Sequence, residues 1–166
     1  MARPRAVVAV TVLAAASVTG WWLGGSRHTA TPSARVIDVL DGDTIVVALA
    51  DGSTDTVRLL GVDTPETHHP TRPVECYGPE AAAYTERRLL GEVVTLEPDV
   101  ETRDLYDRRL AYVVHDGRRF NDELLRRGYA KLLVLAPNRA HAHDLLAAEL
   151  DARAAGRGLW GRCDAG

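Results

Sequence analysis

The sequence has few cysteines, few aromatic residues and almost no lysine. Its 166 residues include two cysteines, one phenylalanine and a single lysine, Lys131. Two cysteines are too few for a disulfide-dense scaffold, and neither has a second ligand at zinc-finger spacing. The formal net charge of −3 argues against strong nonspecific binding of nucleic acid over the whole surface, because such binding grows with the number of phosphates neutralised. Any such binding must rest on a local basic cleft.

The first 25 residues differ from the rest of the chain. Arg3 and Arg5 precede an uncharged run, residues 6–23. The run is longer than the apolar part of a secretory signal, about 7–15 residues, and long enough for a spanning helix of about 17–25 residues. A cleaved signal peptide and an N-terminal membrane anchor both stay open, while a buried core helix of about 10–14 residues fits less well. Either export reading places the rest of the chain outside the cytoplasm, secreted or attached to the membrane through residues 6–23.

Beyond this segment the chain has room for one domain. Residues 26–33 are polar and predict a linker, and residues 34–166 form the expected domain. Loss of residues 1–25 would change the formal charge to −5, because two arginines and no acids are removed. In an oxidising compartment an even number of cysteines usually pairs, so we expect a disulfide between Cys76 and Cys163. Closing so long a loop would stabilise the fold by roughly 4–5 kcal/mol in the chain-entropy model.

The pattern of apolar and turn residues predicts an α+β fold, a small barrel with helices. Five β-branched or aliphatic runs predict strands, at 35–40, 44–49, 54–60, 93–97 and 110–114. Three stretches predict helices: one from Gly78-Pro79 to just before Gly91, one over 122–127 capped by Asn121, and one over 141–155. Asp51-Gly52 is a typical hairpin turn. Five strands with this helix order fit an oligonucleotide-binding-type barrel plus three helices.

Two aspartates occupy strand ends in a way that suits a divalent cation. Asp43 follows Gly42 and opens a predicted strand, and Asp63 ends another strand just before Pro65. Carboxylates held by separate strand ends can bind a hard cation that keeps several waters. Either aspartate alone would be read as a turn former, so the prediction of a metal site rests on the pair.

Two arginines and one glutamate complete the set of candidate residues. Arg58 and Arg108 lie on or beside separate predicted strands, and guanidinium groups bind phosphate oxygens two at a time. The alternative for each is a surface ion pair, worth about 0–1 kcal/mol. Glu66 is a further carboxylate that can act on water, or else a loop residue with no such role. The adjacent His68 and His69 are not expected to bind metal.

These candidate residues lie in three segments, 41–44, 58–66 and 104–108. Together with the connecting segments 76–81, 109–113 and 158–160, they make the chain resemble the thermonuclease (staphylococcal nuclease-like) family from about Ala34 to Trp160. The resemblance implies a five-stranded barrel with three helices and a monomeric, calcium-dependent nuclease. Such an enzyme cleaves DNA and RNA at the bond to the 5′ oxygen and leaves 3′-phosphate ends. It further implies the site: calcium on Asp43, Asp63 and the carbonyl of Thr64, water prepared by Glu66, phosphate bound by Arg58 and Arg108, and substrate contacted by Tyr106.

The chain departs from the family pattern at two places. Asp107 stands where the family carries glycine, at a position expected to need a positive φ angle, which aspartate tolerates better than most residues. An acid there is also expected to weaken the phosphate affinity of Arg108. The segment 131–138 lacks the two tyrosines that form an aromatic platform in well-studied members. Since stacking is worth about 1–3 kcal/mol per base, we expect weaker nucleotide binding.

Two rival functions stay open from the sequence. Barrels of this family also serve as non-catalytic nucleic-acid or protein binding modules, although those have lost acids or arginines that this chain retains. A nuclease restricted to particular nucleic acids or to a surface-bound role is the other. The sequence does not distinguish DNA from RNA as the preferred substrate.

Overall fold

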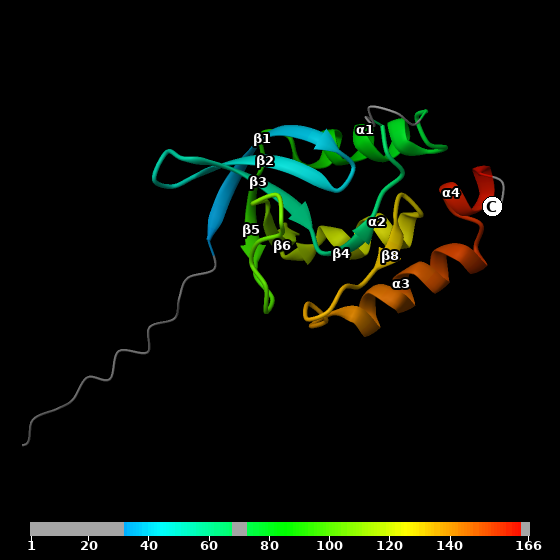
Figure 1. Ribbon diagram of the computed structural model, residues 1–166. Coiled ribbons are helices and arrows are strands. Elements are labelled where there is room, and N and C mark those ends of the chain that lie inside the picture. Colours follow the sequence, from blue (N-terminus) through cyan, green and yellow to red (C-terminus); the bar gives the residue numbers. More distant parts are fainter. Residues whose placement is uncertain (1–31, 68–72, 164–166) are drawn as a thin grey trace, which may run out of the picture.

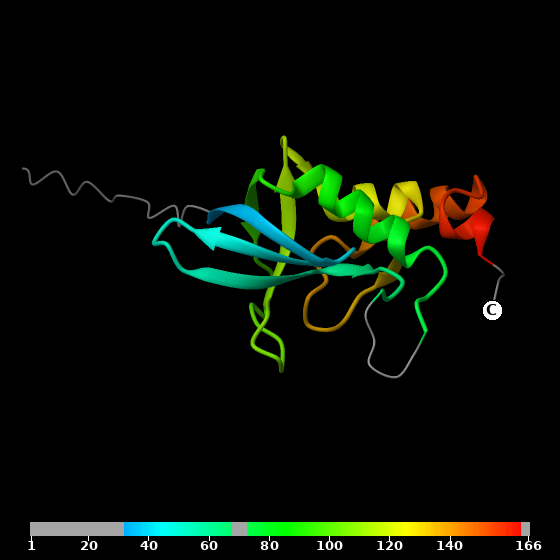
Figure 2. The ribbon, with the colours of Figure 1, turned by 90° about the horizontal axis from the view of Figure 1, so that it is seen from above.

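The computed structural model describes residues 32–67 and 73–163 (Figures 1 and 2). The predicted signal or anchor over residues 1–25, most of the 26–33 linker, and the pair His68 and His69 lie outside the described residues. The first strand begins at Ser33, one residue before the predicted start of the domain. Within the described part of the chain, no helix is long and apolar enough to span a membrane.

Five strands form the predicted barrel. They are β1 (Ser33–Asp41), β2 (Thr44–Leu49), β3 (Thr54–Leu59), β5 (Val93–Glu97) and β6 (Arg109–His115). The antiparallel order is β3-β2-β1-β5-β6, and a parallel pairing of β3 with β6 closes the sheet on itself. The short β7 (Arg118–Arg119) extends the sheet beside β6. The prediction of a five-stranded oligonucleotide-binding-type barrel is confirmed.

Alternating apolar residues fill the barrel. Val36, Ile45, Val47, Val57 and Leu59 are each at most 1% exposed, as expected for strands that turn every second side chain inward. The β2–β3 hairpin uses the predicted turn: Gly52 has a φ of 85°, and Oδ1 of Asp51 accepts a hydrogen bond from the Ser53 amide at 2.9 Å. Figures 1 and 2 show this hairpin projecting from one end of the molecule and the helices gathered at the other.

The predicted end of the third strand is wrong. The sequence pattern ran it through Leu60, but β3 ends at Leu59 and a separate strand, β4 (Gly61–Asp63), follows. Gly61 has a φ of 75°, and a Cβ atom there would collide with the side chain of Leu145. The chain therefore turns at Gly61, and Asp63, at the end of β4, lies outside the barrel sheet. β4 pairs with a strand that the sequence did not predict, β8 (Lys131–Leu133).

The three predicted helices are present, as α1 (Gly78–Leu89), α2 (Phe120–Arg127) and α3 (Ala142–Ala154), with a short additional helix, α4 (Leu159–Arg162). The prediction that Asn121 caps α2 is wrong, since the helix begins at Phe120 after Arg119. Asn121 is fully buried: its Nδ2 donates to the carbonyl of Leu60 at 2.7 Å, and its Oδ1 accepts from the amide of Val113 at 2.9 Å. It supplies partners to buried backbone groups of the barrel.

The predicted disulfide is present between Cys76 and Cys163, which lie 87 positions apart. Cys76 precedes α1 and Cys163 follows α4. The bridge therefore ties the end of the chain to the segment that leads from Asp63 into the first helix.

Candidate active site

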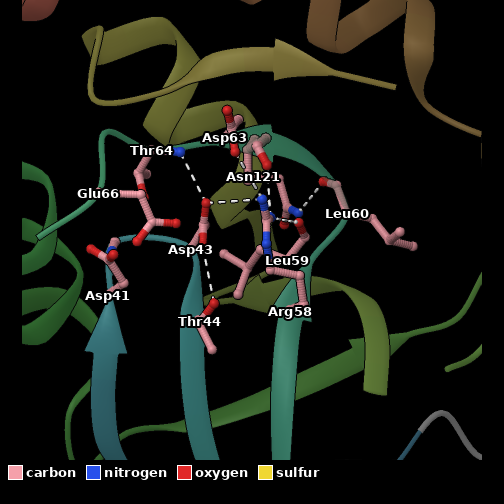
Figure 3. Close-up of polar contacts among 12 residues, drawn as sticks. Asp41, Asp43, Thr44, Arg58, Leu59, Leu60, Asp63, Thr64, Glu66 and Asn121 are labelled. Carbon is pink, nitrogen blue, oxygen red and sulfur yellow. Dashed lines mark hydrogen bonds and ion pairs between the residues drawn. The ribbon is translucent and has the colours of Figure 1, made fainter. Parts of the chain in front are cut away.

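The two predicted metal carboxylates meet at one end of the barrel. Asp43 sits in the turn between β1 and β2, and Asp63 is the last residue of β4. An oxygen of each lies 3.1 Å from the same atom, Nη2 of Arg58 (Figure 3). The oxygens of the two carboxylates are therefore separated by no more than twice that distance, although their residues are 20 positions apart in the sequence. Asp43 is only 6% exposed, whereas the side chain of Asp63 is about half exposed.

Hydrogen bonds from two threonines fix the orientation of Asp43. Its Oδ1 accepts from Oγ1 of Thr44 at 3.0 Å, and its Oδ2 accepts from the backbone amide of Thr64 at 2.9 Å. The turn must contain Gly42, because a Cβ atom there would lie 2.8 Å from Cγ2 of Thr64. Close approach of the two segments thus places Thr64 directly beside the Asp43 carboxylate.

Arg58 is the central cation of this cluster. Its Nη1 donates to the carbonyls of Leu59 at 2.8 Å and Val62 at 2.7 Å, while Nη2 faces the two carboxylates. The side chain is 15% exposed. These contacts fix the guanidinium in one orientation, a condition for preorganised stabilisation of a phosphate. In this form the arginine is engaged with Asp43 and Asp63, so a cation bound by those carboxylates would share them with it.

Backbone contacts on both sides hold the loop that carries Glu66. The Glu66 amide donates to Oε2 of Glu75 at 3.2 Å, and the Glu75 amide donates to the Glu66 carbonyl at 2.9 Å. Beyond it, the amide and hydroxyl of Thr67 donate to the carboxylate of Asp41 at 3.3 and 3.2 Å. Figure 3 shows the Glu66 side chain beside Asp41 and Asp43. Asp41, which the resemblance leaves outside the metal site, here anchors the loop.

The second predicted arginine lies in a groove next to this cluster. The groove, called here the Tyr106 groove, has a volume of about 520 Å³ and is lined by residues that include Arg58, Tyr106, Arg108, Leu133 and Leu135. Because Arg58 on β3 pairs with Leu110 on β6, Arg108 lies close to Arg58, two residues before Leu110 and directly before β6 begins. Both arginines thus face one space.

Arg108 is held by its own loop. Its Nε donates to Oδ2 of Asp104 at 2.7 Å, and its guanidinium carbon lies 5.5 Å from the centre of the Tyr106 ring. Burial raises the pKa of Asp104, but hydrogen bonds from Arg108 and Tyr106 outweigh this and leave that pKa below its usual value. Asp107 has a φ of 62°, as predicted for this position, and its carboxylate faces Arg103 at 3.6 Å.

The predicted loss of an aromatic platform can be tested by restoring it. Leu135 lines the Tyr106 groove and is 65% exposed, so a larger ring fits there without disturbing the core. We expect Leu135→Tyr to tighten binding of a 5′-mononucleotide by about tenfold, since stacking on one base is worth about 1–3 kcal/mol. Equilibrium titration of wild type, Leu135→Tyr and the non-aromatic control Leu135→Met would measure this. Equal affinities of all three would show that the position does not contact the base.

Burial sets the ionisation of Asp63. Burial raises the pKa of this carboxyl. The charge of Arg58 lowers the pKa, and the charges of Asp43 and Glu75 raise it, so that the pKa of Asp63 lies above its usual value. Ionising Asp63 therefore costs more free energy in the metal-free fold than in the unfolded chain.

A consequence is that Asp63→Asn should stabilise the metal-free protein. Above the raised pKa the wild-type carboxylate destabilises the fold, and the neutral amide removes that penalty; below the unfolded pKa both forms are neutral and the difference disappears. We expect a gain of at most about 1 kcal/mol, because solvent screens a half-exposed group. Thermal unfolding in chelator at neutral pH and near pH 3 measures it. In calcium we expect the order to reverse, because Asp63 is a predicted metal ligand and a bound ion would stabilise the wild type more than the variant. A variant less stable than the wild type in chelator at neutral pH would refute the argument.

The donor set fits a hard cation with few protein ligands. Among the described residues, no group of three or more His, Cys, Asp or Glu side chains could hold a metal ion. The predicted site needs only two carboxylates and the Thr64 carbonyl, and waters would complete the coordination. Oγ1 of Thr64, beside Asp43, is buried and has no hydrogen-bond partner in the described part of the chain, so a water bound to the metal ion could donate to it. The residues thus fit calcium or magnesium.

A comparison with protein families identifies the family of this chain. Residues 56–162 match the model described as "Staphylococcal nuclease homologue", a range that contains Arg58, Asp63, Glu66 and Arg108. The chain belongs to the staphylococcal nuclease family.

Individual relatives agree with this assignment. The chain is 40% identical over 126 residues to the "Thermonuclease" of Staphylococcus hyicus, covering 76% of this chain and 74% of that protein. It is 40% identical over 124 residues to the "Thermonuclease" of Staphylococcus intermedius, covering 75% and 73%. Similarity to "Endonuclease YncB" of Bacillus subtilis (strain 168) is 37% over 125 residues, covering 74% of this chain and 59% of the relative.

Within this nuclease-family fold, the predicted residues fall into one region. Asp43, Arg58 and Asp63 are in contact, Thr64 touches Asp43, and Arg108 shares the Tyr106 groove with Arg58. Sequence reasoning missed Lys131, which lies directly opposite Asp63 in the β4–β8 pair. Its sequence signal was only that it is the sole lysine, because neither three-residue strand has a pattern long enough to recognise.

Proposed function

We propose that this chain is a calcium-dependent nuclease that hydrolyses phosphodiester bonds of DNA and RNA with little sequence specificity. The observation that carries the proposal is the convergence of Asp43 and Asp63 on one nitrogen of Arg58, beside Thr64 and Glu66. Relatives of the same family with 37–40% identity are named thermonucleases or endonucleases. A cation site beside phosphate-binding arginines is the minimal equipment for phosphodiester hydrolysis.

Asp43, Asp63 and the carbonyl of Thr64 would hold the calcium ion. When bound, the ion polarises the phosphate and lowers the pKa of water. The carboxylate of Glu66 accepts a proton from the attacking water. The loop that carries Glu66 is held by the contacts of its backbone with Glu75. The Arg58 guanidinium, already oriented by the Leu59 and Val62 carbonyls, binds a non-bridging phosphate oxygen as negative charge develops there.

Arg108 would bind the same phosphate from the other side of the Tyr106 groove. Asp104 holds its Nε, which leaves the terminal nitrogens for the substrate. Water attacks phosphorus in line with the 5′ oxygen; the new bond is phosphorus to water oxygen and the broken bond is phosphorus to the 5′ oxygen. The products are a 3′-phosphate and a 5′-hydroxyl, whose proton comes from solvent.

The cellular setting forms part of the proposal. Residues 1–25 would direct export, either as a cleaved signal or as an anchor through residues 6–23, and the domain would act as a monomer outside the cytoplasm. The Cys76–Cys163 disulfide supports an oxidising location.

Degradation of single-stranded DNA and of RNA by the purified chain tests the activity. We expect rapid loss of polymer with calcium, much slower loss with magnesium, none with chelator, and 3′-phosphate ends by mass spectrometry. No cleavage by the folded protein in any metal would refute the proposal and favour a non-catalytic binding module of the same fold.

A further inference from the structure

A second hollow lies on the other side of the proposed metal site. This space, called here the Trp160 cavity, has a volume of about 560 Å³, and its lining includes Asp63, Thr64, Lys131, Arg153 and Trp160. The Cys76–Cys163 disulfide forms another part of the wall. The cavity lining therefore includes two residues predicted to bind the metal, Asp63 and Thr64, but none of Arg58, Glu66 and Arg108, which are predicted to take part in catalysis.

The two hollows occupy opposite ends of one short ladder. In the β4–β8 pair, Gly61 lies opposite Leu133 and Asp63 lies opposite Lys131. Gly61 and Leu133 line the Tyr106 groove, whereas Asp63 and Lys131 line the Trp160 cavity. Two residues of strand span about 7 Å. A polynucleotide crossing the metal site along this ladder would leave one hollow and enter the other.

A buried acid holds Arg153, one of the two cationic side chains of the cavity, in place. Glu149 on α3 is 4% exposed, and its Oε1 accepts from the amide of Leu132 in β8 at 3.0 Å and from Nη2 of Arg153 at 3.2 Å. The Arg153 guanidinium carbon also lies 4.1 Å from the centre of the Trp160 ring. One carboxylate thus joins β8 to α3, which Figure 1 shows side by side, and positions Arg153 next to the strand that carries Lys131.

The charges in the cavity suit a phosphate once a divalent ion is present. Asp63 and Glu75 are its acids; Asp63 is a predicted metal ligand, and Oε2 of Glu75 accepts the Glu66 amide. Lys131 and Arg153 supply two positive charges, of which Glu149 offsets one through its contact with Arg153, so a divalent ion at Asp63 is what makes the site positive. A planar guanidinium stacked on an indole is a suitable surface for a nucleotide. In a chain of net charge −3, a local basic site of this kind is required for binding a polyanion.

We propose that the Trp160 cavity is a second nucleotide subsite, which binds the nucleotide adjoining the scissile phosphate on the side away from Tyr106 through Lys131 and Arg153. This inference rests on the proposed function for the direction of the substrate, but binding in the cavity does not require cleavage. It predicts that substrate length matters: an octanucleotide reaches the cavity, whereas a dinucleotide cannot fill both hollows.

Two variants with the same charge change test the subsite. Lys131→Ala/Arg153→Ala removes the cavity cations, and Arg118→Ala/Arg126→Ala removes two exposed arginines that line a different hollow beside α2. In calcium, the ratio of kcat/KM for a single-stranded octanucleotide to that for a dinucleotide should fall about tenfold in the first variant and stay within twofold in the control. Equal ratios in both variants would overturn the proposal, as would equal losses on both substrates.

Binding of a cleavage-resistant phosphorothioate octanucleotide in calcium gives a readout that does not depend on catalysis. In the full chain carrying Trp21→Phe and Trp22→Phe, Trp160 is the only tryptophan, so its emission reports on the cavity. We expect the octanucleotide to change this emission, and the slope of log affinity against log salt to fall by about 1.4 in Lys131→Ala/Arg153→Ala, since each phosphate contact contributes about 0.7 on single strands. If binding shows this pattern but no metal supports cleavage, the proposed function fails and the subsite stands. If cleavage occurs but emission and salt slope match the control, the subsite is refuted.

Discussion

Glu66→Gln is expected to lower kcat for DNA cleavage by about 10²–10⁴, the range that a general base contributes. Glutamine keeps the length of the side chain but cannot take a proton from water near neutral pH. The loop should retain its position, because Glu75 holds it through the backbone amide and carbonyl of residue 66. Steady-state kinetics on single-stranded DNA in saturating calcium would measure the loss of turnover. A pH profile of kcat would show whether the fall in rate at low pH, which reports protonation of the base, disappears in the variant.

The matched control is Glu86→Gln, which makes the same chemical change at an exposed position of α1 and should leave kcat unchanged. Calcium binding by isothermal titration should change far less than kcat in Glu66→Gln, since the carboxylate is not assigned to the metal. Retention of more than a tenth of wild-type turnover would remove Glu66 from the role of base.

Arg58→Ala is expected to have the second large effect, and to act on both turnover and stability. Loss of one preorganised donor to a developing oxyanion lowers kcat by about 10²–10³. The same change leaves the carboxylates of Asp43 and Asp63 facing each other without the nitrogen that lies 3.1 Å from both. Breaking a buried ion pair costs about 3–5 kcal/mol; we expect about 3, because Thr44 and Thr64 still donate to Asp43. Calcium should restore part of this stability.

Kinetics and thermal unfolding, each with and without calcium, separate the two effects. Arg58→Lys keeps a positive charge but loses the planar fork, so it should recover more stability than turnover. Arg35→Ala serves as the control, because Arg35 is an exposed arginine of β1 whose Nη1 donates to the Gly91 carbonyl. Near-normal turnover of folded Arg58→Ala in calcium would exclude this arginine from the mechanism.

The barrel could be predicted from sequence because its strands carry their own signals. Val36, Ile45, Val47 and Val57 follow a period of two between turn residues, and their burial in the core follows from it. By contrast, β4 and β8 are three residues each, and their pairing depends on the turn at Gly61 and its contact with Leu145. Asn121 was misread for a related reason: it bonds the buried carbonyl of Leu60, just after β3, and the buried amide of Val113 on β6, and these contacts override its local preference for a cap.

The site could be predicted as a set of residues but not as a set of contacts. The family resemblance implied Asp43, Arg58 and Asp63, and these three do meet. That Arg58 spans both carboxylates, or that Asp104 holds Arg108, depends on strand register and loop geometry, which single residues do not encode. The roles of these residues in metal binding and catalysis stay predictions until the variants are measured.

The parallel seam between β3 and β6 also bears on how this molecule reaches its active form. β1, β2 and β3 pair through short turns, whereas Val57 meets Arg109 only after the intervening helix and strand are in place. Contacts between distant segments form slowly, because loop closure must come first. Arg58 and Arg108 lie on the two sides of this seam, so we expect recovery of nuclease activity during refolding to lag behind the recovery of secondary structure measured by circular dichroism. Simultaneous recovery of both signals would show that the barrel closes early.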